Sequence, residues 1–237
     1  MILFDQTFPT PQENLACDEA LLEWREKSGG EEILRFWQAQ NYFAVLGYTN
    51  KLDAELNLKN CECDGVPVLR RVSGGGTVLH GTGSLCYALV LQAQGEFHNL
   101  TSTNHFVMEK MRAAIAPLVA GKVEVRGTTD LALDNRKFSG NAQRRKKNWL
   151  LFHGTFLLNF DVQKIEDYLR FPPIVPDYRA ARNHADFVTN LHVETDEVKA
   201  AIADIWNARK AELQLPTGEI QKLVQDRYSS EEWTRRF

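Results

Sequence analysis

The segment Arg70–His80, which reads RRVSGGGTVLH, has the residue types and spacing expected of a site for an anionic ligand. Three consecutive glycines, Gly74 to Gly76, allow the backbone to adopt positive φ and to approach a ligand closely. Successive backbone N–H groups in such a loop can bind an anion, and arginine guanidinium forks suit phosphate and carboxylate groups. The same residues are compatible with a tight turn at a sheet edge beside an exposed arginine, so the residues alone leave both interpretations open.

Two common phosphate-binding patterns do not match this segment. It lacks the Lys-Ser/Thr ending of a P-loop, and no helix pattern follows it, as a dinucleotide-binding fingerprint requires. An anion site here would therefore be of another kind.

A second group of polar residues begins at Asp130 and includes Lys137 and the stretch Ser139-Gly140-Asn141. Strict strand alternation predicts that Lys137, Ser139 and Asn141 share one face and that Phe138 points to the other. A lysine beside small polar residues could reach a bound acid. An ordinary exposed lysine after a turn is the alternative interpretation.

A third polar group, His153-Gly154-Thr155, lies inside the otherwise apolar stretch WLLFHGTFLLNF. A histidine on such a strand is most often a core residue whose hydrogen bonds are satisfied. From the residues alone, His153 is therefore no more than a candidate for the site.

The elements that must position these groups alternate between helix and strand patterns. A helix is predicted from the capping box at Thr10 and Pro11 to the glycines at 29 and 30, and three more around residues 101–118, 198–205 and 220–224. The strand-length runs are Ile33–Trp37, Tyr42–Gly47, Pro67–Leu69, Ser84–Gln92, Leu131–Leu133, Lys137–Gln143 and Trp149–Phe160. The prolines of Phe171–Arg179 predict an irregular segment.

Short turns between neighbouring strands indicate one α+β domain over residues 1–237, with a mixed, largely antiparallel sheet flanked by helices. Hydrophobic residues make up 43% of the 237 residues, enough for a full core. The sequence has no secretory signal and no run of about 18 apolar residues that would span a membrane. We therefore expect a soluble, cytoplasmic protein.

The charge pattern gives no sign of a nucleic-acid or membrane partner, since the net charge is −3. The basic run Arg144–Lys147 is expected to be a solvated turn, with steering of an acidic protein domain as the alternative. Four cysteines have no zinc spacing. Cys61 and Cys63 are expected at the surface and Cys86 in the core.

The glycine-rich segment resembles the signature of the lipoate–protein ligase A family, Arg-Arg-x-Ser-Gly-Gly-Gly-Thr/Ala-Val-x-His. The resemblance continues along the chain in the expected order. The family's Asp-Leu pair and its Lys-x-Ser-Gly-x-Ala motif match Asp130-Leu131 and Lys137–Ala142. His153-Gly154-Thr155, the stretch Val188–Leu191 and the terminal YSSEEW match later family segments.

This resemblance implies the fold of the biotin/lipoate ligase catalytic domain, which is similar to class II aminoacyl-tRNA synthetases. It implies that ATP, with Mg²⁺, activates lipoate or octanoate to an acyl-adenylate. The acyl group then forms an amide with a lysine of a lipoyl-domain protein, such as an E2 subunit, a glycine cleavage H protein or a related carrier.

The same resemblance implies the site residues. Lys137 is the expected catalytic residue, in contact with the acid's carboxyl group and the adenylate phosphate. Asp130 is expected near the phosphate and its Mg²⁺. The residues expected to bind ATP or the adenylate are Arg71, Ser73, Gly74, Gly75, Gly76, Thr77, Val78, Leu79, His80, Asp130, Lys137, Gly140, His153, Gly154 and Thr155.

Two other functions compete with the ligase. Octanoyltransferases of the same superfamily use a cysteine nucleophile without ATP. In one branch this cysteine precedes the lysine motif, but Val123–Leu133 contains no cysteine, which favours the ligase. A non-catalytic protein that holds lipoate or a partner is the second competitor, and the complete glycine segment argues against it.

Many bacterial members of the family carry a further small C-terminal domain, which this sequence is expected to lack. The short form implies either a separate accessory subunit or a version specialised for one acceptor. The sequence leaves open the acceptor, the choice between lipoate and octanoate, and the oligomeric state.

Overall fold

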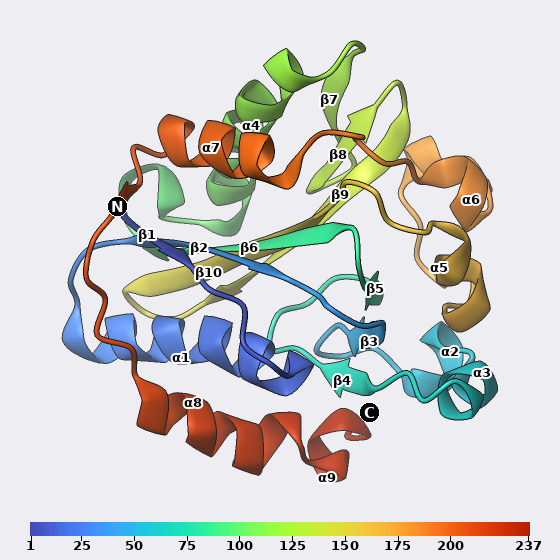
Figure 1. Ribbon diagram of the computed structural model, residues 1–237, viewed down its shortest axis with the longest axis horizontal. Coiled ribbons are helices and arrows are strands. Elements are labelled where there is room, and N and C mark those ends of the chain that lie inside the picture. Colours follow the sequence, from blue (N-terminus) through green and yellow to red (C-terminus); the bar gives the residue numbers. More distant parts are fainter.

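An eight-stranded sheet runs through the middle of the molecule in the computed structural model, which describes residues 1–237 (Figure 1). In spatial order its strands are β11 (Arg209–Lys210), β1 (Ile2–Asp5), β2 (Ile33–Gln38), β6 (Ser84–Gln92), β10 (Trp149–Leu157), β9 (Arg136–Arg145), β8 (Asp130–Leu133) and β7 (Val123–Arg126). A smaller sheet has the order β4 (Val68–Arg70), β3 (Phe43–Leu46) and β5 (Val78–His80).

The large sheet is parallel only at one edge, where β1 pairs with β2 and β11. Every pairing from β2 to β7 is antiparallel. The long central strands β6 and β10 pair along their whole length, from Ser84 with Leu157 to Gln92 with Trp149. The predicted α+β fold with a mixed, largely antiparallel sheet flanked by helices is confirmed.

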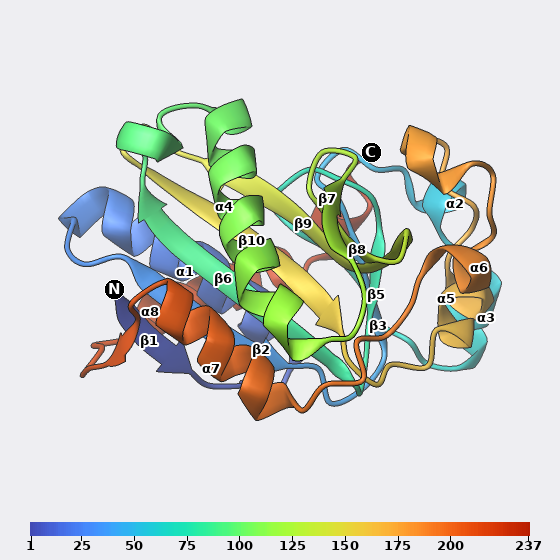
Figure 2. The same cartoon turned by 90° about the horizontal axis from the view of Figure 1, so that it is seen from above.

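Helices cover both faces of this sheet (Figures 1 and 2). On one face lie α4 and α7, which contact each other, and on the other lies α1 with α8 outside it. The short helices α2, α3, α5 and α6 gather at one end, beside the smaller sheet. The bounds are α1 (Pro11–Ser28), α2 (Leu52–Glu55), α3 (Leu58–Cys63), α4 (Leu100–Ile115), α5 (Gln163–Tyr168), α6 (His184–Phe187), α7 (Thr195–Ile205), α8 (Thr217–Leu223) and α9 (Glu231–Thr234).

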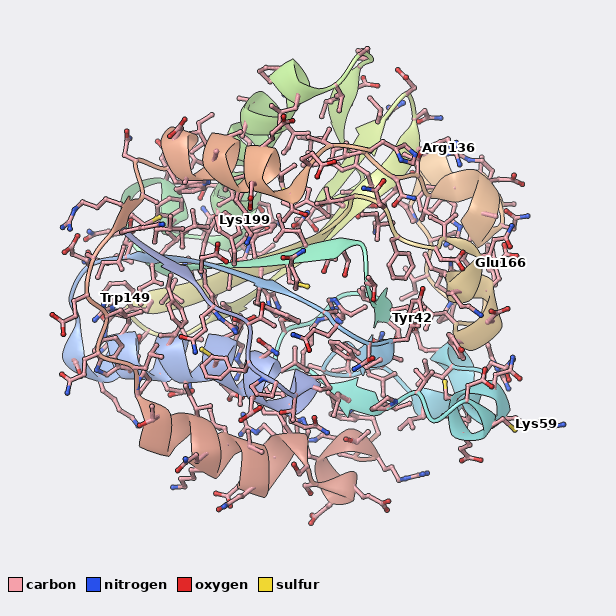
Figure 3. The ribbon with its side chains drawn as sticks, viewed as in Figure 1. Tyr42, Lys59, Arg136, Trp149, Glu166 and Lys199 are labelled. Atoms are coloured by element: carbon pink, nitrogen blue, oxygen red, sulfur yellow. The ribbon has the colours of Figure 1, made fainter.

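Both faces of the central strands are buried, so β6 is apolar at consecutive positions. Leu89 points into the core under α4 and α7, together with Phe152 and Met111. The neighbouring Ala88 and Val90 point into the core under α1. A third apolar cluster, which includes Leu79 and Phe187, lies between the smaller sheet and the short helices. Trp149 marks the α1 side of the sheet in Figure 3.

The sequence missed the shortest elements. Strand β1 was not predicted because its run of four residues is too short to show a period, and its partners β2 and β11 lie far along the chain. The one-turn helices α2 and α6 were also missed, because four residues are too few to show a helical period. The run Trp149–Phe160 stops being a strand at Leu157. Phe171–Arg179 is irregular, as expected, apart from a 3₁₀ turn at its end.

The expectation that Cys61 and Cys63 form a surface pair is wrong for Cys61. Cys63 is exposed, but Cys61 is buried. The reason is that the two residues lie on different sides of helix α3, and Cys61 faces the apolar cluster of the smaller sheet. Cys86 is buried on β6, as predicted.

A β-bulge on β9 overturns the predicted alternation around Lys137. Leu131 pairs with Ser139, but Ala132 pairs with Lys137, so Phe138 is an extra residue without a partner. Such a bulge shifts the side-chain alternation by one position. Lys137 therefore lies on the same face as Asp130 and beside Gly140, opposite to the face of Ser139.

The face of Ser139 is the one turned to the core under α4 and α7. Asn141 donates to the Ser139 hydroxyl at 3.2 Å and accepts a hydrogen bond from Tyr87 at 2.6 Å. Tyr87 and Phe138 both belong to that core. Lys137 thus lies on the opposite face of β9 from these two small polar residues, although all three border the same cavity.

None of the helices combines the length and the hydrophobicity that a membrane-spanning helix needs.

The capping box of α1 yields a stability prediction. The Thr10 hydroxyl accepts a hydrogen bond from the Glu13 amide at 3.2 Å, and the Glu13 carboxylate accepts one from the Thr10 amide at 3.0 Å. We expect Thr10→Ala to lower the free energy of unfolding by about 1 kcal/mol, because an orphan amide loses its acceptor. Urea denaturation measures the change.

Thr101→Ala is the control for that measurement, since Thr101 is exposed in the first turn of α4 and its side chain makes no hydrogen bond. Its effect should stay within about 0.5 kcal/mol. Equal stability of the two variants would show that the cap contributes nothing.

Candidate functional site

A cavity of about 510 Å³ lies between the glycine-rich loop, the strands β6, β8, β9 and β10, and the segment 165–188. Most of the predicted site residues line it: Arg71, Gly75, Gly76, Thr77, Val78, Leu79, His80, Asp130, Lys137, Gly140, His153, Gly154 and Thr155. Ser73 and Gly74 are the two that do not. The fold therefore brings three distant parts of the sequence to one hollow.

The glycine-rich loop depends on close backbone packing. Gly75 has φ of 87°, which side chains with a Cβ rarely adopt. Its carbonyl oxygen lies so near Gly47 that a Cβ on Gly47 would be only 2.0 Å away. Asn50 donates from its amide to the same carbonyl at 3.2 Å and to the Thr77 hydroxyl at 3.3 Å. The loop is thus held on its protein side, while Gly74 to Gly76 stay exposed to solvent.

Arg71 braces this loop with its guanidinium. It donates to the carbonyls of Gly74, Gly76 (2.8 Å) and Val45 (3.2 Å), and to the Ser73 hydroxyl (3.1 Å). Burial lowers the pKa of Arg71 to about 10, so it remains charged at neutral pH. Arg71 was expected to bind phosphate directly. Its hydrogen bonds to the loop give it a second, structural role that the sequence did not indicate.

Lys137 and Asp130 form an ion pair at the opposite wall, with Nζ 2.7 Å from Oδ1. The Tyr178 hydroxyl donates to Oδ2 of the same carboxylate at 2.8 Å. Burial, followed by the charge of Asp130, raises the pKa of Tyr178, which stays protonated. The backbone of Lys137 is fixed as well, because its carbonyl accepts from the Thr189 amide at 2.8 Å.

The segment 165–188 closes this side of the cavity and is tied to β9. The guanidinium of Arg136 donates to the carbonyls of Ala185 (3.2 Å) and Val188 (2.8 Å). From α5, Glu166 accepts a hydrogen bond from the Ala185 amide at 3.1 Å. Figure 3 shows Arg136 and Glu166 beside α6. The segment supplies Tyr178 to the site.

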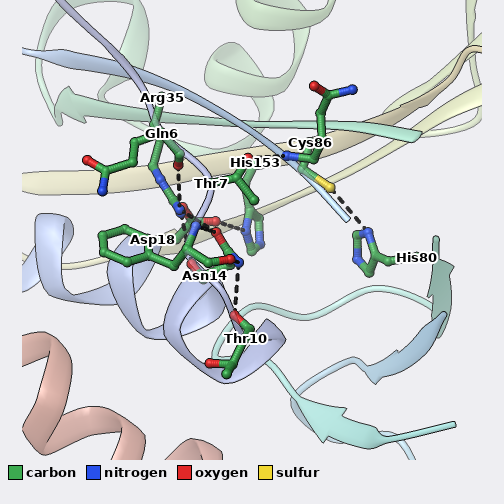
Figure 4. A network of polar contacts seen from close by, with 11 residues as sticks. Gln6, Thr7, Thr10, Asn14, Asp18, Arg35, His80, Cys86 and His153 are labelled. Atoms are coloured by element: carbon green, nitrogen blue, oxygen red, sulfur yellow. Dashed lines mark hydrogen bonds and ion pairs between the residues drawn. The ribbon is translucent and has the colours of Figure 1, made fainter. Parts of the chain in front are cut away.

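A chain of polar contacts links His153 to Asp18 and Arg35 (Figure 4). Ser73 Oγ lies 2.6 Å from His153 Nε2, and His153 Nδ1 lies 3.8 Å from the Asp18 carboxylate. Asp18 forms an ion pair with Arg35, which is fully buried. Burial alone would raise the pKa of Asp18, but the charge of Arg35 and the contact with His153 outweigh it, and the pKa is lowered. His153 is therefore not an isolated core histidine.

A second histidine, His80, lines another part of the cavity wall. Its Nδ1 is 3.2 Å from Cys86 Sγ, and its ring stacks on Phe43 with 5.0 Å between centroids. Burial, with a smaller contribution from Arg71, lowers the pKa of His80 to about 3. Burial also raises the pKa of Cys86. The pair is therefore a neutral thiol beside a neutral imidazole at pH 7.

Sequence reasoning missed the residues that hold the site from behind. Asp18, Asn50 and Tyr178 contact site residues, yet each belongs to a segment without a recognisable motif. A weak signal existed for Asp18, because a carboxylate on the apolar side of a predicted helix needs a buried partner. Nothing in the sequence indicated Asn50 or Tyr178.

The family model for the lipoyl protein ligase A/B catalytic domain matches residues 10–214. That span includes the glycine-rich loop, Lys137 and His153. The chain belongs to the lipoyl protein ligase A/B catalytic domain family.

Two curated members show the breadth of the family. The chain is 35% identical over 161 residues to the probable lipoate-protein ligase A of Mycoplasma genitalium, covering 67% of this chain and 46% of the relative. It is 29% identical over 211 residues to octanoyltransferase LipM of Oceanobacillus iheyensis, covering 79% of this chain and 76% of the relative. The matched part spans about half the length of the Mycoplasma ligase.

Solved structures share the fold. The bipartite lipoate protein ligase of Thermoplasma acidophilum, described with its E2 lipoyl domain, superimposes with a TM-score of 0.84 at 22% identity, over 99% of this chain and 95% of that one. A lipoate-protein ligase A bound with ATP gives a TM-score of 0.81 at 24% identity, over 99% and 97%. The expected ligase-type fold is confirmed.

The ion pair beneath the loop gives a prediction about stability and pH. We expect Asp18→Asn to lower the free energy of unfolding by about 3–5 kcal/mol at pH 7, because Arg35 would keep a buried, uncompensated charge. The folded-state pKa of Asp18 lies below its unfolded value. Its contribution is therefore present above about pH 4 and is lost as the pH falls further.

Urea denaturation of both proteins between pH 7 and pH 3 measures this. The gap in stability should narrow toward pH 3. Asp5→Asn is the matched control, since Asp5 pairs with Lys199 near the surface, and it should cost less than about 1 kcal/mol. A gap that stays constant with pH would exclude ionised Asp18 as the cause.

Proposed function

We propose that this chain is an ATP-dependent ligase that joins lipoate or octanoate to a lysine of a lipoyl-domain protein. The observation that carries the proposal is the position of Lys137. Its ammonium group lies in the same cavity as the glycine-rich loop, fixed by Asp130. A cation facing a loop of free backbone amides suits an acid and a phosphate that must meet.

The proposed reaction has two steps. In the first, a carboxylate oxygen of the acid attacks the α-phosphorus of ATP, and the bond to pyrophosphate breaks. In the second, the acceptor's neutral ε-amine attacks the acyl carbon and the acyl C–O bond to AMP breaks. AMP leaves, and the amine loses one proton to solvent. Both steps need alignment and charge stabilisation more than covalent help.

The residues divide these tasks. The amides of Gly74 to Gly76 would bind phosphate oxygens, and the backbone from Gly76 to Leu79 would contact the nucleotide. Lys137 would neutralise charge on the carboxylate and the α-phosphate. Arg71, Ser73 and His153 would keep the loop in place, which their mutual contacts support.

Mg²⁺ would arrive with ATP. The chain has no group of three or more His, Cys, Asp or Glu side chains that could hold a metal ion by itself. Magnesium bound through phosphates needs only one or two carboxylates from the protein, and Asp130 is the carboxylate that fits, since it lines the cavity beside Lys137. The ion would neutralise phosphate charge there.

The acceptor is proposed from the relatives. The Thermoplasma ligase was described with an E2 lipoyl domain and as bipartite. A lipoyl domain is accordingly the proposed acceptor here, and a separate accessory subunit is a proposed partner.

One relative favours a second candidate, ATP-independent octanoyl transfer through a cysteine. The cysteine in the cavity wall is Cys86. Its raised pKa and the lowered pKa of its neighbour His80 oppose formation of a thiolate–imidazolium pair. The ligase remains the preferred proposal.

ATP–pyrophosphate exchange tests the ligase directly. We expect exchange with lipoate or octanoate and none with biotin. Lys137→Ala should lower the exchange rate at least about tenfold, since a hydrogen bond to a charged group is worth roughly 1.5–3 kcal/mol. Lys199→Ala, which removes a lysine that pairs with Asp5 away from the cavity, should keep the rate. Exchange with none of the acids would refute the ligase, and full exchange by Lys137→Ala would remove that lysine from the mechanism.

Replacing the cavity cysteine separates the two candidates. Cys86→Ser should retain ATP-dependent acylation of a lipoyl domain within about threefold, because a nucleophile is not required. Gel-shift or mass analysis of the acceptor measures this. Acyl transfer from an octanoyl thioester without ATP, lost in Cys86→Ser, would instead support the transferase.

A further inference from the structure

The C-terminal residues 217–237 pack along α1 and end beside β4 (Figure 1). Their anchor is Glu19, which is buried on α1. Tyr228 donates from its hydroxyl to Glu19 Oε2 at 2.8 Å, and Arg227 forms an ion pair with Oε1. Glu19 directly follows Asp18 on α1. Two consecutive carboxylates of this helix therefore bind different parts of the chain.

The anchored segment then reaches the base of the glycine-rich loop. The guanidinium of Arg227 lies 4.4 Å from the centre of the Trp233 ring. Trp233 Nε1 donates to the Arg70 carbonyl at 2.8 Å, and Arg70 donates back to the Thr234 carbonyl from Nε and Nη2, at 3.0 and 2.7 Å. Arg70 and Thr234–Trp233 thus hold each other by reciprocal hydrogen bonds.

Arg70 passes this constraint to the turn Gly47–Asn50. Its Nη1 donates to the carbonyls of Gly47, Tyr48 and Asn50, at 2.9, 3.0 and 2.7 Å. The side chain is fully buried. Its charge faces backbone carbonyls, so Arg70 acts on the shape of the turn and has no part in the cavity wall.

The turn Gly47–Asn50 holds the glycine-rich loop in place. The Tyr48 amide donates to the Ser73 carbonyl at 2.9 Å. Asn50 bonds Gly75 and Thr77, and Gly47 leaves the space that the Gly75 carbonyl occupies. Three hydrogen bonds and one close backbone approach therefore connect the turn to a loop whose glycines would otherwise have great conformational freedom.

We propose that Arg227–Thr234 is a positioning clamp for the anion-binding loop, and that it acts through Arg70 and the turn Gly47–Asn50. The proposal rests on the proposed function for the identity of the anion, an ATP phosphate. Trp233, Arg70 and Asn50 are its positioning residues. A loop that is ordered before the ligand arrives binds more tightly, because less conformational entropy is lost on binding.

The first experiment uses the ligand-free protein, so it does not depend on the enzymatic activity. Trp233→Phe removes the indole donor and keeps an aromatic ring. Hydrogen–deuterium exchange is followed at two hydrogen-bonded amides, that of Tyr48, which donates to the Ser73 carbonyl, and that of Arg71, which donates to the Leu46 carbonyl. Their exchange should become about two- to tenfold faster, since the hydrogen bond from Trp233 to Arg70 is lost. Trp206→Phe is the matched control, because Trp206 is buried in the core under α4 and α7 and its Nε1 has no partner.

Trp206→Phe should leave exchange of the Tyr48 and Arg71 amides unchanged even if it lowers the melting temperature more. Equal exchange in the wild type and Trp233→Phe would overturn the clamp. Equal acceleration in both variants would overturn it too, because a general loss of stability would then explain the result.

The second experiment separates ATP from the acid. Asn50→Ala should raise KM for ATP by about three- to tenfold, as expected for two weak hydrogen bonds. KM for lipoate should stay within twofold. Asn148→Ala, which removes a side-chain bond to Glu26 at the far hairpin, is the control and should change neither constant. A parallel rise in both constants would show a general structural effect and contradict the proposal.

The two failures can be told apart. If the wild type shows no ATP–pyrophosphate exchange with any acid, the ligase fails. Hydrogen–deuterium exchange of the Tyr48 and Arg71 amides still decides whether the clamp exists. If the wild type is active but Trp233→Phe and Asn50→Ala behave like their controls, the clamp fails and the ligase stands.

Discussion

Asp18 and Arg35 join α1 to β2 through a buried ion pair, and the arrangement of the site depends on it. Removing two charges from water is costly, and the cost is offset only when each charge finds good partners. Arg35 also donates to Asn14, and Asp18 turns its second oxygen toward His153. His153 then meets Ser73, and Ser73 accepts a hydrogen bond from Arg71. The loop is thereby fixed relative to the sheet.

This dependence explains why the cavity can combine exposed glycines with a defined shape. Gly74 to Gly76 have no side chains that could hold the loop. The loop is ordered by Arg71, whose guanidinium donates hydrogen bonds to the loop carbonyls from the protein side. Inward carbonyls leave the backbone amides free to face a ligand, which is the arrangement that an anion requires. Lys137 faces the loop from an independent hairpin, fixed by Asp130 and Tyr178.

The sequence predicted what is local and missed what is tertiary. The capping box at Thr10 and the glycine-rich loop depend on neighbouring residues, so their patterns were readable. The contact between His153 and Ser73 joins residues 80 positions apart, and no periodicity encodes it. Arg70 and Arg71 look alike in sequence, yet one braces a turn and the other the loop itself. Which carbonyls each would reach depends on the fold.

The extra residue at Phe138 limits how the lysine motif can be transplanted. The hexapeptide Lys137–Ala142 holds its lysine beside Asp130 only because β9 is one residue longer than its partner at this point. On a regular hairpin the same six residues would direct the lysine to the opposite side, toward a core where a charge is unstable. A designer who grafts the motif onto another scaffold must therefore include the bulged hairpin as well. A comparison that ignores the extra residue would assign the wrong neighbours to the lysine.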